Sequence, residues 1–475
     1  MKLLLSQVLS ITAPRPDDPR RRRPKITKIK GLGWTPIVKL KRRPLSNCFM
    51  ASIAVVGLGY VGLIHAVGFT LIGHRVVGYD INRTVVESLR RGRPHIYEPG
   101  LEEALRKALE GGRLKFTDSL EDAVAESEAA FIAVGTPSAP DGSADLSQVE
   151  AAARAVGRAM RGKKWYLVVV KSTVPPGTTE SLVAGAVAEE SGAELGVGFS
   201  VASNPEFLRE GTALEDFFKP DRVVIGAGDE KAASFLLEVY RPIEAPKIVM
   251  KPREAELVKY VSNVFLALKI SFANEVGLLA KRLGVDTYRV FEAVGLDRRI
   301  GPHYFGAGLG FGGSCFPKDL RAYIKLGDRL GVDLHIAKAS YVVNEYMLQH
   351  AVELLEKHLG DLRGRRIGVL GLAFKPNTDD VRESRGVELA KMLVARGAVV
   401  YVHDPVAVEK AKAALGNAVV YVEDPQFLVD NTEAVVIATA WPQYEELNYT
   451  NTIVIDGRRI KKAREAKIYE GIAWA

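Results

Sequence analysis

The feature that most constrains the fold is a glycine-rich turn, Gly57-Leu58-Gly59-Tyr60-Val61-Gly62, which directly follows the apolar run Ile53–Val56. The glycines allow a tight turn, a close approach of the backbone to a pyrophosphate and close packing of the next helix on the strand. The N-terminus of that helix favours negative charge. A strand, this turn and a helix in succession predict a dinucleotide-binding unit; a turn needed only for packing is the alternative.

An acidic residue at the end of the next expected strand supports the dinucleotide interpretation. Asp80 follows Arg75–Tyr79, where a carboxylate can accept a hydrogen bond from a ribose 2′-hydroxyl. The same carboxylate would repel a 2′-phosphate, so the sequence favours NAD over NADP. Arg83 lies close enough to weaken this preference, though not to reverse it.

Short strand patterns alternate with longer helical patterns through the first half of the chain, which predicts a parallel sheet with helices on both faces. The alternation resumes after residue 366, so we expect a second α/β domain. Expected strands are Ile53–Val56, Arg75–Tyr79, Ala130–Val134, Tyr166–Lys171, Arg222–Ile225, Arg366–Leu370, Val399–His403, Ala434–Ala438 and Ile453–Asp456, with helices such as Gly62–Leu71 and Gly100–Leu109 between them.

The middle of the chain has a different pattern. Glu254–Arg282 lacks proline, and its apolar residues recur every three or four positions, which predicts one helix of about 28 residues and ~42 Å. The expected fold class is therefore α/β, with two Rossmann-like domains that have parallel sheets, joined by a helical middle domain containing a long central helix. The expected divisions are a basic tail (1–49), an NAD-binding domain (50–245), a helical middle domain (246–350) and a second α/β domain (351–475).

The second α/β half departs from the first. Gly368-Val369-Leu370-Gly371 follows a strand pattern, but no third glycine arrives, and Phe374-Lys375-Pro376 occupies the expected turn. Asp404 ends the next strand, as Asp80 does in the first half. We interpret this half as a dinucleotide-type fold reshaped for another nucleotide ligand.

The basic charge of the chain belongs to its first 49 residues. They hold 13 of the 65 Lys and Arg residues but only two of the 57 acidic ones, so the remainder has 52 basic and 55 acidic residues. We therefore expect no nucleic-acid partner for the folded body. The segment itself has three interpretations: an upstream start assigned in error, with translation beginning at Met50; a targeting segment; or a polyanion-binding arm.

Cysteine usage excludes a disulfide framework and a Cys-based zinc site, because the chain has only Cys48 and Cys315. No apolar run approaches the length of a bilayer span, and we expect no membrane partner and no metal. Cys315 ends the glycine-rich stretch 308–314, which suggests a nucleophile. If a helix begins there, its dipole and Lys318 would stabilise a thiolate, and Asp319, at i+4, could manage a proton. A structural cysteine is the alternative.

On the long expected helix, Lys259 and Asn263 are four residues apart and share one face. Without further context, the default interpretation would be a surface lysine beside a hydrogen-bonding asparagine.

Together these motifs resemble the UDP-glucose/GDP-mannose dehydrogenase family across residues 51–475. The motifs that carry the resemblance are the Gly57–Gly62 turn, Val134-Gly135-Thr136-Pro137, Ser172-Thr173-Val174-Pro175-Pro176-Gly177, the segment 204–211, the Cys315 loop, Phe374-Lys375-Pro376 and the segment 379–384. The resemblance implies a four-electron oxidation of a nucleotide-sugar C6 alcohol to a carboxylate with two NAD, through a covalent thiohemiacetal and thioester on Cys315.

The resemblance also implies roles for the matched residues. Lys259 and Asn263 would stabilise an oxyanion, while Asp319 and Glu206, with Thr173 and a water, would handle protons. Cofactor contacts would come from the glycine turn, Asp80, Arg83, Thr136, Thr173, Glu210, Lys318 and Arg382. Nucleotide-sugar contacts would come from Glu206, Phe207, Leu208, Lys259, Asn263, Phe311, Gly312, Lys375, Arg458 and Arg299, the last supplied by a neighbouring subunit.

UDP-glucose is the expected substrate, and we expect a cytoplasmic protein that forms a homodimer or a higher homo-oligomer. The resemblance implies that residues 246–350 form the subunit contact and that residues 351–475 bind the nucleotide-sugar. UDP-galactose, GDP-mannose and UDP-N-acetylmannosamine remain open, because Gly301-Pro302-His303-Tyr304 is similar to relatives that act on N-acetylated sugars. A two-electron hydroxyacid dehydrogenase and a non-catalytic nucleotide-binding protein are the competing interpretations. The first has no use for the loop cysteine, and the second predicts that the polar site residues would be missing.

Overall fold

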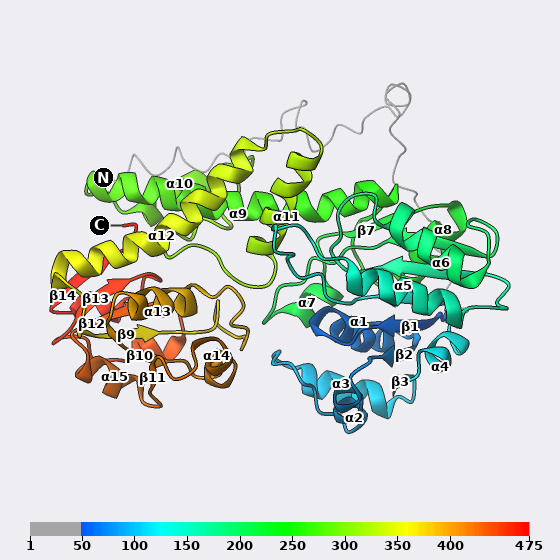
Figure 1. Ribbon diagram of the computed structural model, residues 1–475, viewed down its shortest axis with the longest axis horizontal. Helices are drawn as coiled ribbons and strands as arrows, with labels where there is room; N and C mark the ends of the chain where they lie inside the picture. The colour runs from blue at the N-terminus through cyan, green and yellow to red at the C-terminus, as the bar shows by residue number, and fades with distance from the viewer. Residues whose placement is uncertain (1–48, 475) are drawn as a thin grey trace, which may run out of the picture. The chain divides into compact units, whose positions relative to one another are not determined.

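The computed structural model describes residues 49–474 and confirms the expected fold class over that range: two sheets of Rossmann type and a helical middle (Figure 1). The basic N-terminal segment up to Cys48 lies outside the described residues, so its three interpretations stay predictions. The strands form where short runs of β-branched and apolar residues are bounded by turns. In β5 (Tyr166–Val170), every side chain is buried.

The first sheet has the order β3-β2-β1-β4-β5-β6-β7-β8. The strand order switches sides between β1 and β4: β2 and β3 lie on one side of β1, and β4 and the later strands lie on the other. Ligands of such sheets bind outside the carboxyl ends of the strands at this switch point. One expectation is wrong: the sheet is not wholly parallel, because β7 pairs antiparallel with β6. The strands are β1 (Ser52–Val56), β2 (Arg75–Tyr79), β3 (Leu114–Thr117), β4 (Ala129–Ile132), β5, β6 (Phe199–Ser203), β7 (Val223–Ala227) and β8 (Lys247–Met250).

Helices cover both faces of this sheet, and two apolar cores lie between them and the strands. Asn82, Ser119 and Asp229 begin three of the helices by accepting hydrogen bonds from backbone N–H groups of the first turn. The helices are α1 (Tyr60–Leu71), α2 (Arg83–Arg90), α3 (Leu101–Glu110), α4 (Leu120–Ala125), α5 (Ser147–Ala159), the turn η4 (Thr179–Val183), α6 (Ala184–Ser191), α7 (Ala213–Phe218) and α8 (Glu230–Val239).

The long central helix is confirmed as α9 (Pro252–Arg282), of 31 residues. It begins at a proline, which is tolerated in a first turn, and the Glu254 side chain accepts from the backbone N–H of Lys251 at 2.8 Å. The middle region also contains α10 (Thr287–Gly295), α11 (Phe316–Arg329) and α12 (His335–Leu359), and α9 packs against all three.

By length and composition alone, α9 could cross a bilayer, contrary to the expectation that no segment reaches that length. Its polar residues argue for a core helix. Glu256, Lys259 and Asn263 are buried, and Glu256 accepts hydrogen bonds from the backbone N–H groups of Gly177 and Thr179. Near its other end, Lys281 donates to the carbonyl of Gly471 at 2.7 Å. The helix therefore makes specific polar contacts with both α/β halves.

The second sheet has the order β11-β10-β9-β12-β13-β14, and all of its pairings are parallel. Its strands are β9 (Arg366–Leu370), β10 (Val399–His403), β11 (Val420–Tyr421), β12 (Ala434–Ile437), β13 (Ile453–Asp456) and β14 (Ile468–Gly471). The helices are α13 (Arg385–Ala395), α14 (Val408–Leu415) and α15 (Pro425–Asn431), with short turns η5 (Pro442–Glu445) and η6 (Lys462–Glu465).

Candidate active site

The glycine turn after β1 has the geometry that a dinucleotide requires. Gly57 has φ +92°, and a Cβ on Gly62 would lie 1.8 Å from the carbonyl oxygen of Gly57, so both glycines are needed for the turn and its helix. Gly59 is different: its φ is −62°, and a Cβ there would meet nothing within 4 Å. Nothing in the protein demands glycine at 59, and the bare backbone there fits a closely bound pyrophosphate.

Asp80 lies beside this turn and is half-buried. Its two carboxylate oxygens accept from the backbone N–H groups of Leu58 at 2.7 Å and Asn82 at 2.9 Å, which leaves lone pairs for ribose hydroxyls. Arg83 points to Asp118 at 3.0 Å, with its side chain 82% exposed. A fixed carboxylate therefore lies beside the glycine turn, where the sequence predicts the ribose of NAD.

Cys315 is the N-cap residue of α11, as predicted from the glycine stretch before it and Pro317 after it. Its thiol is half-buried and free. Burial raises the pKa of Cys315, and the Lys259 ammonium opposes that rise. The expectation that Lys318 supports the thiolate is wrong, because Lys318 binds the Asp319 carboxylate at 2.6 Å. The cation that acts on the thiol comes from α9.

Four buried polar side chains surround this thiol. The Lys259 ammonium binds Glu206 Oε1 at 2.9 Å, with the two side chains 4% and 7% exposed. The Asn263 amide donates to Asp319 Oδ2 at 2.6 Å. Burial opposes the charge on Lys259, yet Glu206, Cys315 and Asp319 hold its pKa above the usual value. The default interpretation of a surface lysine and asparagine is therefore wrong.

This arrangement joins three distant segments: the loop after β6, the face of α9 and the first turn of α11. A permanent cation and an amide donor lie with two carboxylates around one thiol. Such a set can stabilise negative charge on oxygen and accept or deliver protons. Thr136, after β4, is buried and receives a hydrogen bond from Lys318 at 3.4 Å, and Thr173, after β5, is half-buried.

Glu210 joins the first half to the Cys315 loop and to the second half. It accepts from the Ser314 hydroxyl at 3.1 Å and from the Thr378 hydroxyl at 3.1 Å, and Arg382 lies 3.5 Å away. Burial and Asp380 raise the pKa of Glu210 to about 7. The proposed cofactor contacts Glu210 and Arg382 are thus brought together.

The loop before Cys315 is held by α12 and α13. The Asn344 amide both accepts from the backbone N–H of Phe311 at 2.7 Å and donates to its carbonyl at 3.1 Å. Arg385 donates to the carbonyls of Leu309 and Asn344. A Cβ on Gly312 would lie 2.2 Å from the carbonyl oxygen of Glu383, which explains the glycine there.

The other predicted substrate residues divide into two groups. Leu208 donates its backbone N–H to Glu206 at 2.5 Å, and the Phe207 ring lies under the Arg222 guanidinium, 3.7 Å from the ring centroid. In the second half, the Arg458 guanidinium donates to the carbonyl of Ala438 at 2.6 Å, and burial lowers the pKa of Lys375.

Arg299 is not brought into this site within the chain. Its side chain is 88% exposed and bonded to Asp297.

Lys171 is a buried residue whose role the sequence reasoning missed. Its ammonium donates to Asn204 at 2.9 Å and to the Tyr240 hydroxyl at 3.2 Å. Burial lowers the pKa of Lys171 to about 7, with Glu206 opposing and Lys259 adding to the shift. The signal was a lysine at the end of a wholly apolar strand pattern, since lysine is rarely buried without a partner.

The fold and the dinucleotide turn define an oxidoreductase that uses NAD. The chain belongs to the UDP-glucose/GDP-mannose dehydrogenase family. It matches the family's NAD binding domain over residues 51–244, its central domain over residues 253–346 and its UDP binding domain over residues 368–463. This membership favours nucleotide-sugar oxidation over the hydroxyacid dehydrogenase and the non-catalytic interpretations.

Several known proteins are similar over nearly the whole chain. UDP-glucose 6-dehydrogenase TuaD of Bacillus subtilis is 41% identical over 423 residues, covering 88% of this chain and 91% of that protein. A solved UDP-glucose dehydrogenase of the hyperthermophilic archaeon Pyrobaculum islandicum is 74% identical with a TM-score of 0.89, covering 92% of this chain and 100% of that one. A solved UDP-D-ManNAc dehydrogenase of Pyrococcus horikoshii is 33% identical with a TM-score of 0.79, covering 89% and 99%.

Proposed function

We propose that this enzyme oxidises UDP-glucose to UDP-glucuronate with two NAD and one water per sugar. The observation that carries the proposal is the buried set of Lys259, Glu206, Asn263 and Asp319 around the Cys315 thiol. The names of the relatives at 41% and 74% identity support UDP-glucose as the sugar. UDP-galactose, GDP-mannose and UDP-N-acetylmannosamine are the alternatives, the last because of the 33% identical structure.

When bound, NAD supplies the hydride acceptor for both oxidation steps. The chain's own part begins with the alcohol, whose proton is taken by a water held near Thr173, Glu206 and Asp319. In the covalent step, the Cys315 sulfur bonds to the aldehyde carbon, and the carbonyl electron pair moves to oxygen. Lys259 and Asn263 stabilise the developing oxyanion. Loss of the remaining hydrogen of that carbon as hydride would convert the thiohemiacetal to a thioester on Cys315. Attack of water on the thioester carbon then breaks the carbon–sulfur bond, which returns the thiol and releases the carboxylate.

The raised pKa of Cys315 has a consequence for this mechanism. Because its pKa is raised, the Cys315 thiol must give up its proton before it attacks, and in this proposal the proton passes to the water held near Glu206 and Asp319, while the Lys259 cation stabilises the sulfur anion. The Lys259–Glu206 pair keeps the cation charged although both side chains are buried. We therefore assign to Glu206 a second role, which is to hold Lys259 protonated throughout the reaction.

In this proposal, the nucleotide-sugar binds between the Phe207–Leu208 segment and the Cys315 loop. Gly312 would offer backbone groups and Phe311 a side chain beside the sugar, while Lys375 and Arg458 would offer cations for a diphosphate. In this proposal, residues 50–245 bind NAD, 351–475 bind the nucleotide, and 246–350 carry Cys315 and the subunit contact.

The subunit contact lies on the outer face of α9. Leu257, Val261, Phe265, Phe272 and Leu279 are between 40% and 62% exposed and recur at intervals of four and seven, so they form one apolar stripe. A second copy is the occupant we propose. Lys269, on the same helix, donates to the carbonyl of Ile300, so a partner on this face would lie beside the Arg299 loop and could receive that arginine. Phe265→Asp should then convert dimer to monomer in light scattering.

We place the enzyme in the cytoplasm, because a free catalytic thiol requires a reducing compartment.

The test of the proposed function is the amount of NADH formed per sugar consumed, for the parent and for Cys315→Ser, across a panel of nucleotide-sugars. We expect two NADH per UDP-glucose from the parent and loss of the uronate from the variant. One NADH per sugar, or indifference to the substitution, would reject the covalent mechanism. Preference for another sugar would correct only the substrate.

A further inference from the structure

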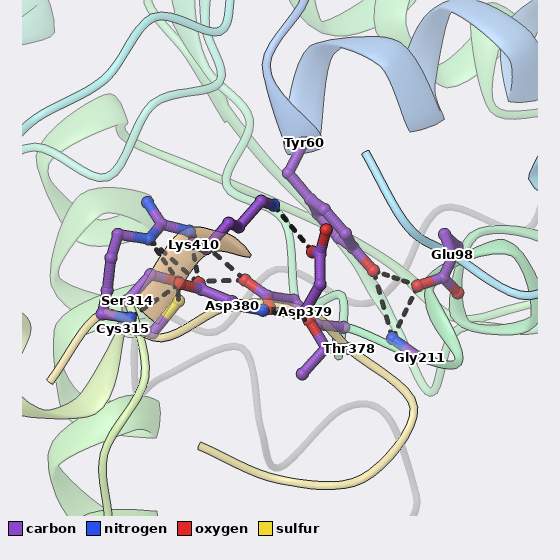
Figure 2. A network of polar contacts seen from close by, with 11 residues as sticks. Tyr60, Glu98, Gly211, Ser314, Cys315, Thr378, Asp379, Asp380 and Lys410 are labelled. Carbon is purple, nitrogen blue, oxygen red and sulfur yellow. Dashed lines mark hydrogen bonds and ion pairs between the residues drawn. The ribbon is translucent and has the colours of Figure 1, made fainter. Parts of the chain in front are cut away.

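Two polar side chains near the glycine turn have no part in the proposed chemistry. Tyr60, the first residue of α1, directs its hydroxyl to the Glu98 carboxylate, as Figure 2 shows. Glu98 lies in the loop before α3 and is 7% exposed. Burial and the neighbouring Glu98 raise the pKa of Tyr60, so the tyrosine stays protonated and donates.

The Glu98 carboxylate also holds a segment that is far away in the sequence. It accepts from the backbone N–H of Gly211 at 2.6 Å and from that of Ala213 at 2.7 Å. Gly211 has φ +84°, and a Cβ there would lie 3.0 Å from the carbonyl oxygen of Asn377 in the second half. Glu98 therefore sets the position of a backbone that has little freedom to shift toward the second half.

The residue next to Gly211 is Glu210, which reaches the cysteine loop. The Ser314 hydroxyl that donates to Glu210 lies 3.6 Å from the Cys315 sulfur. A continuous series of contacts thus runs from the tyrosine of the dinucleotide turn through Glu98, Gly211, Glu210 and Ser314 to the thiol. The hydrogen bonds Tyr60–Glu98, Glu98–Gly211 and Glu210–Ser314 join segments that are distant in the chain, while Gly211–Glu210 and Ser314–Cys315 are neighbours in the sequence.

We infer that Glu98, held by Tyr60, is a positioning residue that places the Glu210–Gly211 segment and, through it, the Ser314–Cys315 loop. One carboxylate then sets both the dinucleotide turn and the thiol. This inference rests on the proposed function for its kinetic consequences. The physical reason is that a buried N–H left without its charged acceptor is costly, so the segment must shift if the carboxylate is changed.

The variant that tests the inference is Glu98→Gln. In the parent, the N–H groups of Gly211 and Ala213 each donate to a different carboxylate oxygen of Glu98, whereas the glutamine amide has the same shape but only one acceptor oxygen. We expect kcat to fall about tenfold to a hundredfold, the typical effect of losing a charge-assisted hydrogen bond. The half-saturating NAD concentration should rise, while the KM for the nucleotide-sugar should change by less than about threefold. Glu103→Gln, an exposed glutamate of α3, is the matched control.

A second readout does not depend on turnover. In a Cys48→Ser background, Cys315 is the only thiol of the chain, and its rate of alkylation by iodoacetamide reports the position of the loop. We expect Glu98→Gln to alkylate several-fold faster than the parent, because a displaced loop exposes the half-buried thiol. Tyr60→Phe should change both readouts in the same direction by less, and should add little in the Glu98→Gln background.

The outcomes separate this inference from the proposed function. Parental kcat, NAD dependence and alkylation rate in Glu98→Gln would overturn the inference. The inference would also be overturned if Glu98→Gln only lowered the stability of the fold and kept the parental kcat, NAD dependence and alkylation rate for each folded molecule. If the parent itself forms one NADH per sugar, the proposed function fails, and the alkylation rates still decide whether Glu98 positions the thiol.

Discussion

The turns that follow β1 and β9 are built on the same plan and used differently. Gly57 and Gly371 have φ +92° and +104°, and each donates its N–H to the end of the neighbouring strand, at Tyr79 and His403 respectively. The helix that follows each turn also needs a glycine. Gly386 fills the place of Gly62, since a Cβ there would lie 2.0 Å from the carbonyl oxygen of Gly371.

The second half therefore lacks the third glycine at the fingerprint spacing, as the sequence indicates, but Gly386 supplies its packing role from a distant position. The loop between Gly371 and Gly386 is much longer than the corresponding loop in the first half, so the spacing of the motif is lost from the sequence. The inserted segment carries Lys375 and Thr378–Arg382. The comparison shows that both halves keep the same glycine packing at the turn, while the second half has a longer loop after the turn that reaches toward the first half.

The carboxylates beside the two turns differ even more. Asp80 is half-buried and accepts two backbone hydrogen bonds. Asp404 is 4% exposed and accepts five, from the N–H groups of Leu372, Ala373, Val406 and Ala407 and from the Trp441 indole. Its capacity is used by the protein itself, so it cannot serve a ribose as Asp80 can.

The largest effect should come from alanine at the helix glycines. Gly62→Ala and Gly386→Ala each place a Cβ against a backbone oxygen that cannot move away cheaply, and we expect a loss of about 1–3 kcal/mol or more of stability in both. Thermal unfolding measured by circular dichroism checks this. A variant of only one half that unfolds at the parental temperature would break the equivalence of the two turns.

The carboxylates should separate the halves more sharply. Asp404→Asn exchanges an acceptor for a donor among buried N–H groups, and we expect a loss of about 1–3 kcal/mol of stability. Asp80→Asn should lower stability by less, yet weaken NAD binding and narrow the preference over NADP. Urea unfolding and fluorescence titration with each dinucleotide measure the two effects. Equal stability losses would contradict the distinction between a structural and a binding carboxylate.

Equivalent strands of the two sheets end at buried charges of opposite sign, and their pH dependences should oppose each other. Lys171 follows β5, and burial lowers its pKa to about 7; Asp456 ends β13, and burial raises its pKa to about 6. Because the unfolded chain binds the lysine proton more tightly, the parent should gain stability relative to Lys171→Met as pH rises above 7. Because the folded chain binds the aspartate proton more tightly, the parent should lose stability relative to Asp456→Asn as pH rises from about 4 to 6.

The slope of each difference is at most about 1.4 kcal/mol per pH unit. Urea unfolding of each variant beside the parent, from pH 4 to 9, measures it. A flat difference for Lys171→Met above pH 7 would mean that this lysine is not held near neutrality.

The smallest effect on stability should come from Gly59→Ala. The corresponding residue of the second half is already an alanine, Ala373. A Cβ added at Gly59 would meet no protein atom within 4 Å. We expect unchanged or slightly raised stability, with NAD binding weakened about tenfold, since the backbone there must approach a pyrophosphate. Calorimetric titration with NAD checks this. Parental affinity would place the pyrophosphate elsewhere on the turn.

Much of this molecule follows from local pattern. The strand of Tyr166–Val170, the start of α11 at Cys315 and the length of α9 were predicted because neighbouring residues decide them, through β-branched runs, glycines and helical period. The strands β3, β6, β8, β11 and β14 were not predicted, and all of them except β6 lie at the edge of a sheet. β8 is half-exposed at a sheet edge, and such strands form through pairing with a neighbour rather than through their own pattern.

The sequence by itself determined that the chain would build two α/β sheets around a long helix and present one cysteine at a helix start. Only the tertiary structure decided which groups act on that cysteine: Lys259 rather than Lys318, with Glu206 and Asn263 as partners. It also decided that the Asp80 carboxylate keeps lone pairs free for a ligand, while the hydrogen-bonding capacity of Asp404 is used by the protein itself. The reason is that hydrogen bonds and ion pairs act across about 3 Å of space, and the groups that meet at this site are separated by tens of residues along the chain.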